Sequence, residues 1–194
     1  YRAMQALGHK DFSCHLEEGG GERSEFWLDY VSDTGDGFAP TYAVAQMVAR
    51  ESVGLTVKDV KREFPRGEVL VMGGDEVYPV ASTDAYEHRF RAPYDGLLEQ
   101  RRRVLALPGN HDWYDGLSAF TRLFCSDIGG RRLAGWWTRQ RRSYFVLKLP
   151  HRWWLVASDG QLQSDLDVPQ MEHFREIAER RRDYRRSPFT DAIA

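Results

Sequence analysis

The stretch VLALPGNHDWYDGL, residues 104–117, runs from four apolar residues straight into a polar turn. Its first part predicts a buried strand. The Pro-Gly-Asn turn ends that strand, because Pro and Gly set the backbone and Asn tolerates left-handed angles. The turn does not explain His111 and Asp112, whose side chains can bind a metal ion or move a proton. Asp115 is better explained as the cap of a helix that follows.

The same order of strand, polar loop and helix occurs three times in the chain. This alternation predicts an α/β fold, with a layered mixed β-sheet that is flanked by helices and contains much parallel pairing. The three repeats place strands at 25–31, 68–72 and 102–107, and helices at 40–53, within 77–95 and within 115–127.

Two further segments extend this pattern. Two apolar runs around the Pro-His-Arg turn at 150–152 predict an antiparallel hairpin that joins the same sheet, and 168–186 predict an amphipathic helix. Residues 1–24 are polar and contain three consecutive glycines, which predicts a flexible lead-in. The domain is therefore expected at 25–194.

The composition is that of a soluble globular protein, with 42% hydrophobic and 29% charged residues in a chain of 194. The net charge of -2 excludes a general attraction to nucleic acid or to an anionic membrane. The arginine clusters are interpreted as solvated helix faces and loop ends. No apolar run approaches the roughly 20 residues that cross a bilayer, so no membrane segment is expected. Two distant cysteines, Cys14 and Cys125, predict free thiols in a reducing compartment, and hence a cytoplasmic location.

Polar side chains follow each of the three predicted strands. Asp33 and Asp36 follow the first strand, Asp75 the second, and Asn110, His111 and Asp112 the third. Ligands of open α/β sheets bind beyond the carboxyl ends of the strands, so we expect these side chains to share one rim. Carboxylate, amide and imidazole groups suit a hard or borderline metal ion, and clustered carboxylates without a cation would repel one another. A single Asp after a strand is often only a turn or cap residue, but three such exits together predict a metal site.

Three motifs in this order resemble those of the calcineurin-like metallophosphoesterases. They are D-x-G at 33–35, G-D-x-x-Y at 74–78 and G-N-H-[DE] at 109–112. The glycine of the first motif and Tyr78 are more similar to the purple acid phosphatase branch than to the D-x-H branch. The order of strands and helices resembles the family over 25–185. The resemblance implies the layered metallophosphoesterase fold, and hydrolysis of a phosphate ester by a hydroxide that a dinuclear metal centre activates.

The resemblance also implies a role for each site residue. It implies four metal ligands: Asp33 on the first metal, Asp75 bridging both, Tyr78 on the first metal as a phenolate, and Asn110 on the second through its amide oxygen. His111 is implied to hydrogen-bond the phosphoryl group or to protonate the leaving oxygen, with Asp112 orienting its ring. The implied cofactors are two metal ions (Fe, Mn or Zn), and the implied partner is a phosphorylated small molecule or another phosphoester substrate. Trp113 and Tyr114 are expected to line its pocket.

The chain departs from the family pattern after the third motif. The V-x-x-H-like and G-H-x-H motifs, which supply further histidine ligands, are absent from the sequence. The remaining histidines are interpreted as ordinary surface or core residues: His9, His15, His88, His151 and His173. We therefore expect the N-terminal half of the fold, truncated at the C-terminus, with partial metal occupancy and little or no turnover. The alternative is a non-catalytic phosphate- or protein-binding module that retains half of the site. An arginine-rich nucleic-acid binder is a third hypothesis, which the overall charge disfavours.

Overall fold

The computed structural model describes residues 13–15, 25–95, 97, 102–125, 131–133, 136–138, 140–150, 153–160 and 165–185. It is a mixed α/β structure whose main sheet is largely parallel and flanked by helices, which confirms the predicted class. The predicted lead-in at 1–24 lies outside the described residues, except for strand β1 (Ser13–His15). No helix within these ranges is long and apolar enough to cross a membrane.

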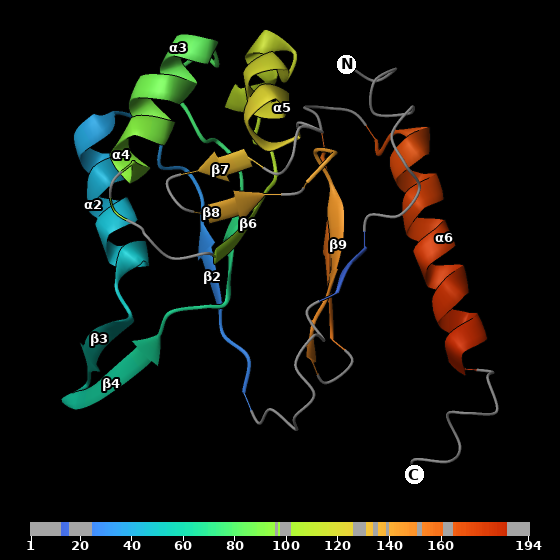
Figure 1. The fold of residues 1–194 in the computed structure, drawn as a ribbon, viewed down its shortest axis with the longest axis horizontal. Coiled ribbons are helices and arrows are strands. Elements are labelled where there is room, and N and C mark those ends of the chain that lie inside the picture. The colour runs from blue at the N-terminus through green and yellow to red at the C-terminus, as the bar shows by residue number, and fades with distance from the viewer. Residues whose placement is uncertain are drawn as a thin grey trace.

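The main sheet has five strands in the order β2-β5-β6-β8-β7, and every pair is parallel except β7 with β8 (Figure 1). Val31 pairs with Met72, and Met72 pairs with Ala106, so the three predicted strands end side by side. This register brings the three polar loops to one edge of the sheet. The strands are β2 (Leu28–Val31), β5 (Val69–Met72), β6 (Arg102–Ala106), β7 (Arg131–Leu133) and β8 (Trp136–Thr138).

Helices cover one face of the main sheet. Strand side chains alternate between the two faces, and Leu70 and Met72 of β5 lie in one buried apolar cluster with Phe90 and Phe120 from the helices. The predicted helices are present with shifted bounds. They are α2 (Phe38–Ala49), α5 (Ser118–Phe124) and a helical run that consists of α3 (Thr83–Ala85), a π-helix (Tyr86–Arg91) and α4 (Ala92–Tyr94).

A second sheet covers the other face. It contains β1, β9 (Phe145–Lys148) and β10 (Trp154–Ala157), in the order β1-β9-β10. The predicted hairpin is therefore present as the antiparallel pair β9 and β10, but the prediction that it joins the main sheet is wrong. Val69 and Val71 of β5 pack instead against Phe145 and Leu147 of β9. A strand that is apolar on both sides needs a cover on both faces, and the second sheet supplies it.

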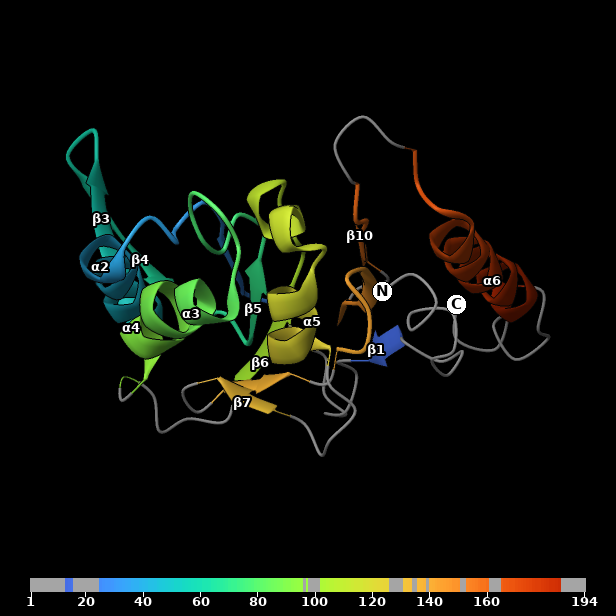
Figure 2. The same ribbon diagram turned by 90° about the horizontal axis from the view of Figure 1, so that it is seen from above.

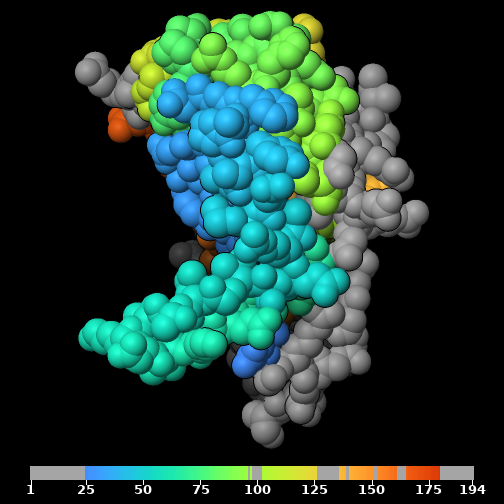
Figure 3. All heavy atoms as spheres, turned by 90° about the vertical axis from the view of Figure 1, so that its left-hand side faces the viewer, coloured from blue at the N-terminus to red at the C-terminus, as the bar shows by residue number. Residues whose placement is uncertain are grey.

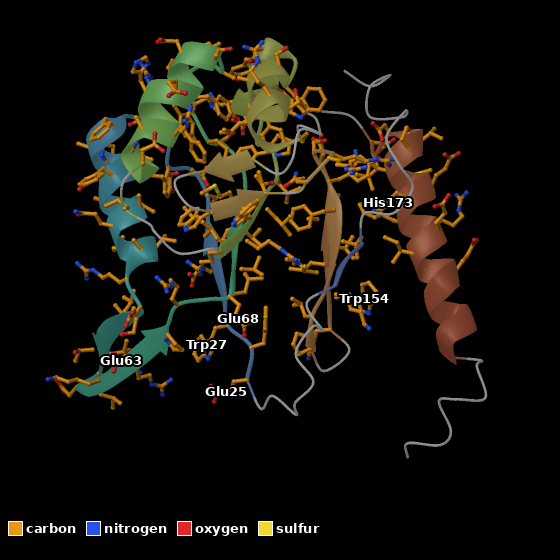
Figure 4. All side chains as sticks on the ribbon, viewed as in Figure 1. Glu25, Trp27, Glu63, Glu68, Trp154 and His173 are labelled. Atoms are coloured by element: carbon orange, nitrogen blue, oxygen red, sulfur yellow. The ribbon has the colours of Figure 1, made fainter. Side chains whose placement is uncertain are left out.

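Helix α6 (Val168–Arg185) lies beyond the second sheet, so that α2 with α3 and α4, the main sheet, the second sheet and α6 follow one another (Figure 2). The Tyr144 ring, just before β9, lies 5.6 Å from the His173 ring and 5.9 Å from the Phe174 ring. His173 is buried on the side of α6 that faces this sheet (Figure 4). It is therefore a packing residue, as the sequence predicted.

A two-stranded hairpin that the sequence did not predict extends away from the body (Figure 3). It consists of β3 (Ser52–Val57) and β4 (Val60–Pro65), which are antiparallel. The turn residues Lys58 and Asp59 have φ of 48° and 62°, as the tight turns of two-residue hairpins require. The hairpin begins where the helix predicted to reach residue 53 has ended, at Ala49. Its base packs on the body through Phe64, whose ring meets that of Trp27 edge-on at 6.1 Å.

The interpretation of the arginine clusters as solvated is wrong for Arg102, which belongs to the run of three arginines at 101–103. Its side chain is buried at the start of β6 and forms an ion pair with Asp29 of β2. The same guanidinium donates to the Val48 carbonyl at 3.3 Å, while the Asp29 carboxylate also accepts from the Gly67 N–H at 3.1 Å. This pair ties two strands and the end of α2 together at the edge opposite the polar loops.

Candidate metal centre

The loops after β2, β5 and β6 contact one another at the carboxyl ends of these strands. The Asp33 N–H donates to the Gly74 carbonyl at 3.0 Å. The His111 N–H donates to Oδ1 of Asp75 at 2.9 Å. The structure thus brings the D-x-G, G-D-x-x-Y and G-N-H-D segments together, as parallel strands with a common end require.

Glycines allow this close approach. A Cβ on Gly109 would lie 2.6 Å from Cγ of Asp75, and a Cβ on Gly74 would lie 2.6 Å from the Gly109 nitrogen. A Cβ on Gly35 would overlap the backbone of the loop after β5. The Gly35 carbonyl accepts from the Tyr78 N–H in the same contact, at 3.0 Å. Each motif therefore needs its glycine for packing between loops.

Two of the predicted metal ligands have left-handed backbone. Asp33 has φ of 58° and Asp75 has φ of 52°. Such a conformation is uncommon for a residue with a side chain and costs about 1–3 kcal/mol. It persists where the surrounding structure over-determines it, and it concentrates at ligand sites. Here it turns the chain sharply after each strand.

Tyr78 joins these two aspartates. Its hydroxyl lies 3.0 Å from Oδ1 of Asp33 and 3.0 Å from Oδ2 of Asp75. A phenol has a single proton, so it can donate to only one of two ionised carboxylates at a time. Burial first, and then hydrogen bonds and charge from the two aspartates, raise the pKa of Tyr78 above its ordinary value. One oxygen each from Tyr78, Asp33 and Asp75 thus converges on a common space. The phenol proton is the positive charge that these oxygens share there, in the position that a metal ion could occupy.

This donor set fits a hard or borderline metal ion. Asn110 adds a half-buried amide on the neighbouring loop, and its side chain caps no helix. Over the described ranges, no group of three or more His, Cys, Asp and Glu side chains has the geometry to hold a metal. The set of candidate metal ligands contains two side chains of these types, the carboxylates of Asp33 and Asp75. Its other donors are the Tyr78 phenol and the Asn110 amide.

His111 lies beside this cluster with a fixed ring. Its Nδ1 lies 2.7 Å from the Pro79 carbonyl, and since a carbonyl only accepts, Nδ1 carries the proton. The ring is also held between aromatic side chains, 4.4 Å from Tyr78 and 5.1 Å from Tyr114 between ring centroids. Nε2 is left to accept or donate a proton according to the charge of the imidazole.

The expected contact between Asp112 and the His111 ring is not what the structure shows. The Asp112 carboxylate is fully buried and accepts from the Tyr86 hydroxyl at 2.6 Å, the Gly109 N–H at 2.8 Å and the Glu76 N–H at 3.2 Å. Its acceptor positions are directed at these groups, and the Pro79 carbonyl orients the imidazole in its place. Burial, only partly offset by the hydrogen bonds, raises the pKa of Asp112 to about 6.

Glu76 is a buried carboxyl that sequence reasoning passed over. It is 2% exposed, and its Oε1 has no hydrogen-bond partner among the described residues. Burial and, after it, the charge of Asp112 raise the pKa of Glu76 well above its ordinary value. The available signal for its burial was its position in G-D-E-V-Y, between Asp75 and an apolar residue. This position directly follows a buried strand, so its side chain can enter the interior.

Asp159 is a second residue that the sequence analysis did not select. It is buried after β10, where one carboxylate oxygen accepts from Trp113 Nε1 at 2.9 Å and the other from the Ser143 hydroxyl. Its backbone N–H and carbonyl bond to the Gln170 amide at 2.9 and 2.8 Å. Trp113 is therefore anchored to the second sheet, whereas Tyr114 is 52% exposed. The sequence signal was a fourth Asp after a strand, in A-S-D-G.

Two smaller predictions also have an outcome. Asp115 caps α5 as expected, since its carboxylate accepts from the Ser118 and Ala119 N–H groups at 2.9 and 3.0 Å. His88 is exposed beside Asp84, at 3.1 Å, on the side of a helix. His9 and His151 lie outside the described residues, as do the side-chain contacts of His15.

Comparisons with family models, with curated proteins and with solved structures gave no match to this chain.

Proposed function

We propose that the chain carries the first half of a metal-dependent phosphoesterase site, of the purple acid phosphatase-like type, on a metallophosphoesterase fold. The observation that carries the proposal is the convergence of the Tyr78 hydroxyl with Asp33 and Asp75, each at 3.0 Å. The motif resemblance and the position of this cluster at the carboxyl ends of parallel strands support it.

The side-chain donors of the candidate metal centre would hold two metal ions (Fe, Mn or Zn). Asp33, Tyr78 and Asp75 would hold one ion, and Asp75 and Asn110 would hold the other. When bound, such a pair supplies a nucleophile at neutral pH and neutralises charge that develops on the phosphoryl group. The His111 N–H donates to Asp75 Oδ1 at 2.9 Å and so fixes the carboxylate that would bind metal.

His111 is the residue that moves a proton. Its Nδ1–H is held by the Pro79 carbonyl, so the protonated ring presents Nε2–H outward. That proton can pass to the leaving oxygen as the phosphorus–oxygen bond breaks, and the imidazole is left neutral. Positioned proton transfer of this kind contributes about 10²- to 10⁴-fold to a rate.

The test is metal binding together with hydrolysis. The purified chain is titrated with Mn²⁺ or Zn²⁺ by calorimetry and assayed with a chromogenic phosphomonoester and a phosphodiester, beside Asp75→Asn. The matched control is Asp36→Asn, because Asp36 is exposed on the loop that carries Asp33. We expect Asp75→Asn to lose metal binding, together with whatever hydrolysis the wild-type chain shows, while Asp36→Asn keeps both. Hydrolysis that survives in Asp75→Asn would reject the mechanism.

Loading the protein with iron tests whether the site is of the purple acid phosphatase-like type. A Tyr78 phenolate on ferric iron gives a visible absorption band, which Tyr78→Phe removes. An iron-loaded protein without such a band would favour a generic metallophosphoesterase site.

The alternative function is a non-catalytic module that binds phosphate or a protein through this half-site. It is favoured by one observation, the absence of a G-H-x-H motif from the printed sequence. Metal binding that depends on Asp75, without turnover of either substrate class, would support this alternative over the enzyme.

A further inference from the structure

The buried Asp112 carboxylate connects two of the loops that form the candidate metal centre. It accepts from the Glu76 N–H at 3.2 Å, in the loop that carries Asp75. Asp112 itself belongs to the loop that carries Asn110, and its carboxylate is fixed there by accepting from the Gly109 N–H at 2.8 Å. Because Asp112 is fully buried, no water competes for these bonds, and its position sets the distance between the two loops.

Tyr86, on the helical run that covers the sheet, holds Asp112 in place. Its hydroxyl donates to Oδ1 of Asp112 at 2.6 Å, the shortest of the three contacts and one in which the acceptor is a carboxylate. The Tyr86 side chain is 3% exposed, and its ring lies 5.9 Å from that of Phe90. The phenol is thus fixed by packing, so its hydroxyl can fix the carboxylate.

The backbone around Tyr86 has a matching irregularity. Tyr86 is the first residue of the π-helix Tyr86–Arg91, within the helical run over 83–94. π-helical turns are rare and occur often near functional sites. This turn belongs to a helical run that otherwise only covers the sheet, and Tyr86, its first residue, is the one whose side chain reaches Asp112.

We infer that Tyr86 is a positioning residue: its hydroxyl, acting through Asp112, holds the loops that carry Asp75 and Asn110 at the spacing that binds metal. The functional consequence rests on the metal centre proposed above. The mechanical part, two loops fastened to one buried carboxylate that a helix holds in place, does not depend on any metal.

Tyr94 provides a matched control. It lies on the same helical run and is fully buried, and its hydroxyl has Thr34, and not Asp112, as its polar neighbour. Tyr86→Phe and Tyr94→Phe thus each remove one buried hydroxyl from the same layer of the core. Only the first removes a donor to Asp112.

The first readout is amide hydrogen exchange in the metal-free protein. We expect Tyr86→Phe to speed exchange at the Glu76 and Gly109 amides about tenfold or more, since a charge-assisted bond at the anchor is lost. Amides of Leu70, in the middle of β5, serve as the internal reference. Tyr94→Phe is expected to leave all three amides unchanged. Equal exchange in wild type and Tyr86→Phe would overturn the inference, and so would equal acceleration in both variants.

The second readout is Mn²⁺ affinity by calorimetry, corrected for the folded fraction. We expect about tenfold weaker binding in Tyr86→Phe, within the range typical of residues that orient metal ligands, and wild-type binding in Tyr94→Phe. Wild-type affinity in Tyr86→Phe would overturn the inference and leave the proposed function standing. Loop exchange that responds to Tyr86→Phe in a protein that binds no metal would support the fastening of the loops and reject the metal centre.

Discussion

Replacing Gly109 by Ala tests the close contact between the loops after β5 and β6. An added Cβ would lie 2.6 Å from Cγ of Asp75, and closer still to its Oδ1 and backbone nitrogen. Part of this obstacle is backbone, which no rotamer change can remove. Gly109 is not among the described glycines with positive φ, so the effect of the substitution is steric and not a matter of backbone conformation.

The size of the effect follows from what has to move. Overpacking of this kind costs about 1–3 kcal/mol. Separating the loops also weakens the bonds that cross between them, from the His111 N–H to Asp75 at 2.9 Å and from the Glu76 N–H to Asp112 at 3.2 Å, each contributing about 1 kcal/mol. We expect the free energy of unfolding to fall by about 3 kcal/mol. For a chain of this size that is a drop in Tm of roughly 6–12 °C.

The assay is urea unfolding in chelator, followed by Mn²⁺ titration. Gly54→Ala is the matched control, because a Cβ there meets nothing within 4 Å, and it should leave both measurements unchanged. Gly109→Ala should lose stability without metal and bind Mn²⁺ at least tenfold more weakly, since Asp75 is displaced. A Gly109→Ala protein within about 0.5 kcal/mol of wild type, with unaltered metal affinity, would refute the close-approach reasoning.

Three further changes have expected outcomes. Asp115→Ala removes the cap of α5 and should lower the free energy of unfolding by about 1 kcal/mol in urea; Asp115→Asn, whose one amide oxygen replaces only one of the two carboxylate acceptors, should lose less stability than Asp115→Ala, and equal losses in both would argue against capping. Arg102→Met leaves Asp29 without its buried partner and should lower the free energy of unfolding by about 3 kcal/mol. Adding Asp29→Leu should restore part of this stability, and no recovery would mean that loss of the ion pair does not cause the destabilisation. Tyr114→Ala removes an exposed ring beside His111 and should raise KM for aryl phosphates several-fold with Tm unchanged; an unchanged KM would remove Tyr114 from the substrate pocket.

The arrangement of the rim was predictable because its signals are local. An apolar run followed by a turn and an Asp identifies the end of a strand, and parallel strands share their carboxyl ends. Asp33 and Asp75 were therefore placed together by the strand pattern, the motif resemblance added Tyr78, and the structure puts the three within hydrogen-bond reach. The cap at Asp115 was predictable for the same reason, since its partners are three and four residues away.

What sequence reasoning missed depends on partners distant in the chain. The burial of Arg102 depends on its partner Asp29, which lies 73 positions earlier in the chain. A run of arginines in the sequence does not reveal this partner. The second sheet could not be told from an extension of the first, because the apolar run of β9, buried at Phe145, Val146 and Leu147, suits either arrangement. The β3–β4 hairpin turns at Lys58 and Asp59, which have φ of 48° and 62° without the glycine that usually signals such a turn.

The orientation of His111 is a subtler case. A histidine followed by an aspartate suggests a pair, but a carbonyl that belongs to Pro79, a residue without a distinctive side chain, holds the ring. Asp112 instead faces the interior, where Tyr86 and two backbone N–H groups bind it. Sequence identifies side-chain chemistry, whereas backbone carbonyls act through position alone. The role of Asp112 therefore changes from orienting a ring to holding loops.

The charge balance of the rim bears on what the site is for. Four carboxyls gather there, from Asp33, Asp75, Glu76 and Asp112, and the ion pairs that the described residues form involve other acidic groups. Burial raises the pKa of Glu76 and of Asp112, which is how such a cluster reduces its repulsion without a cation. Two of these residues also have left-handed backbone. A fold that keeps this arrangement against repulsion and strain gains stability when a cation binds, by about 2.7 kcal/mol at a hundred times the Kd. That gain is a reason to regard the cluster as a ligand site and not as an ordinary set of turns.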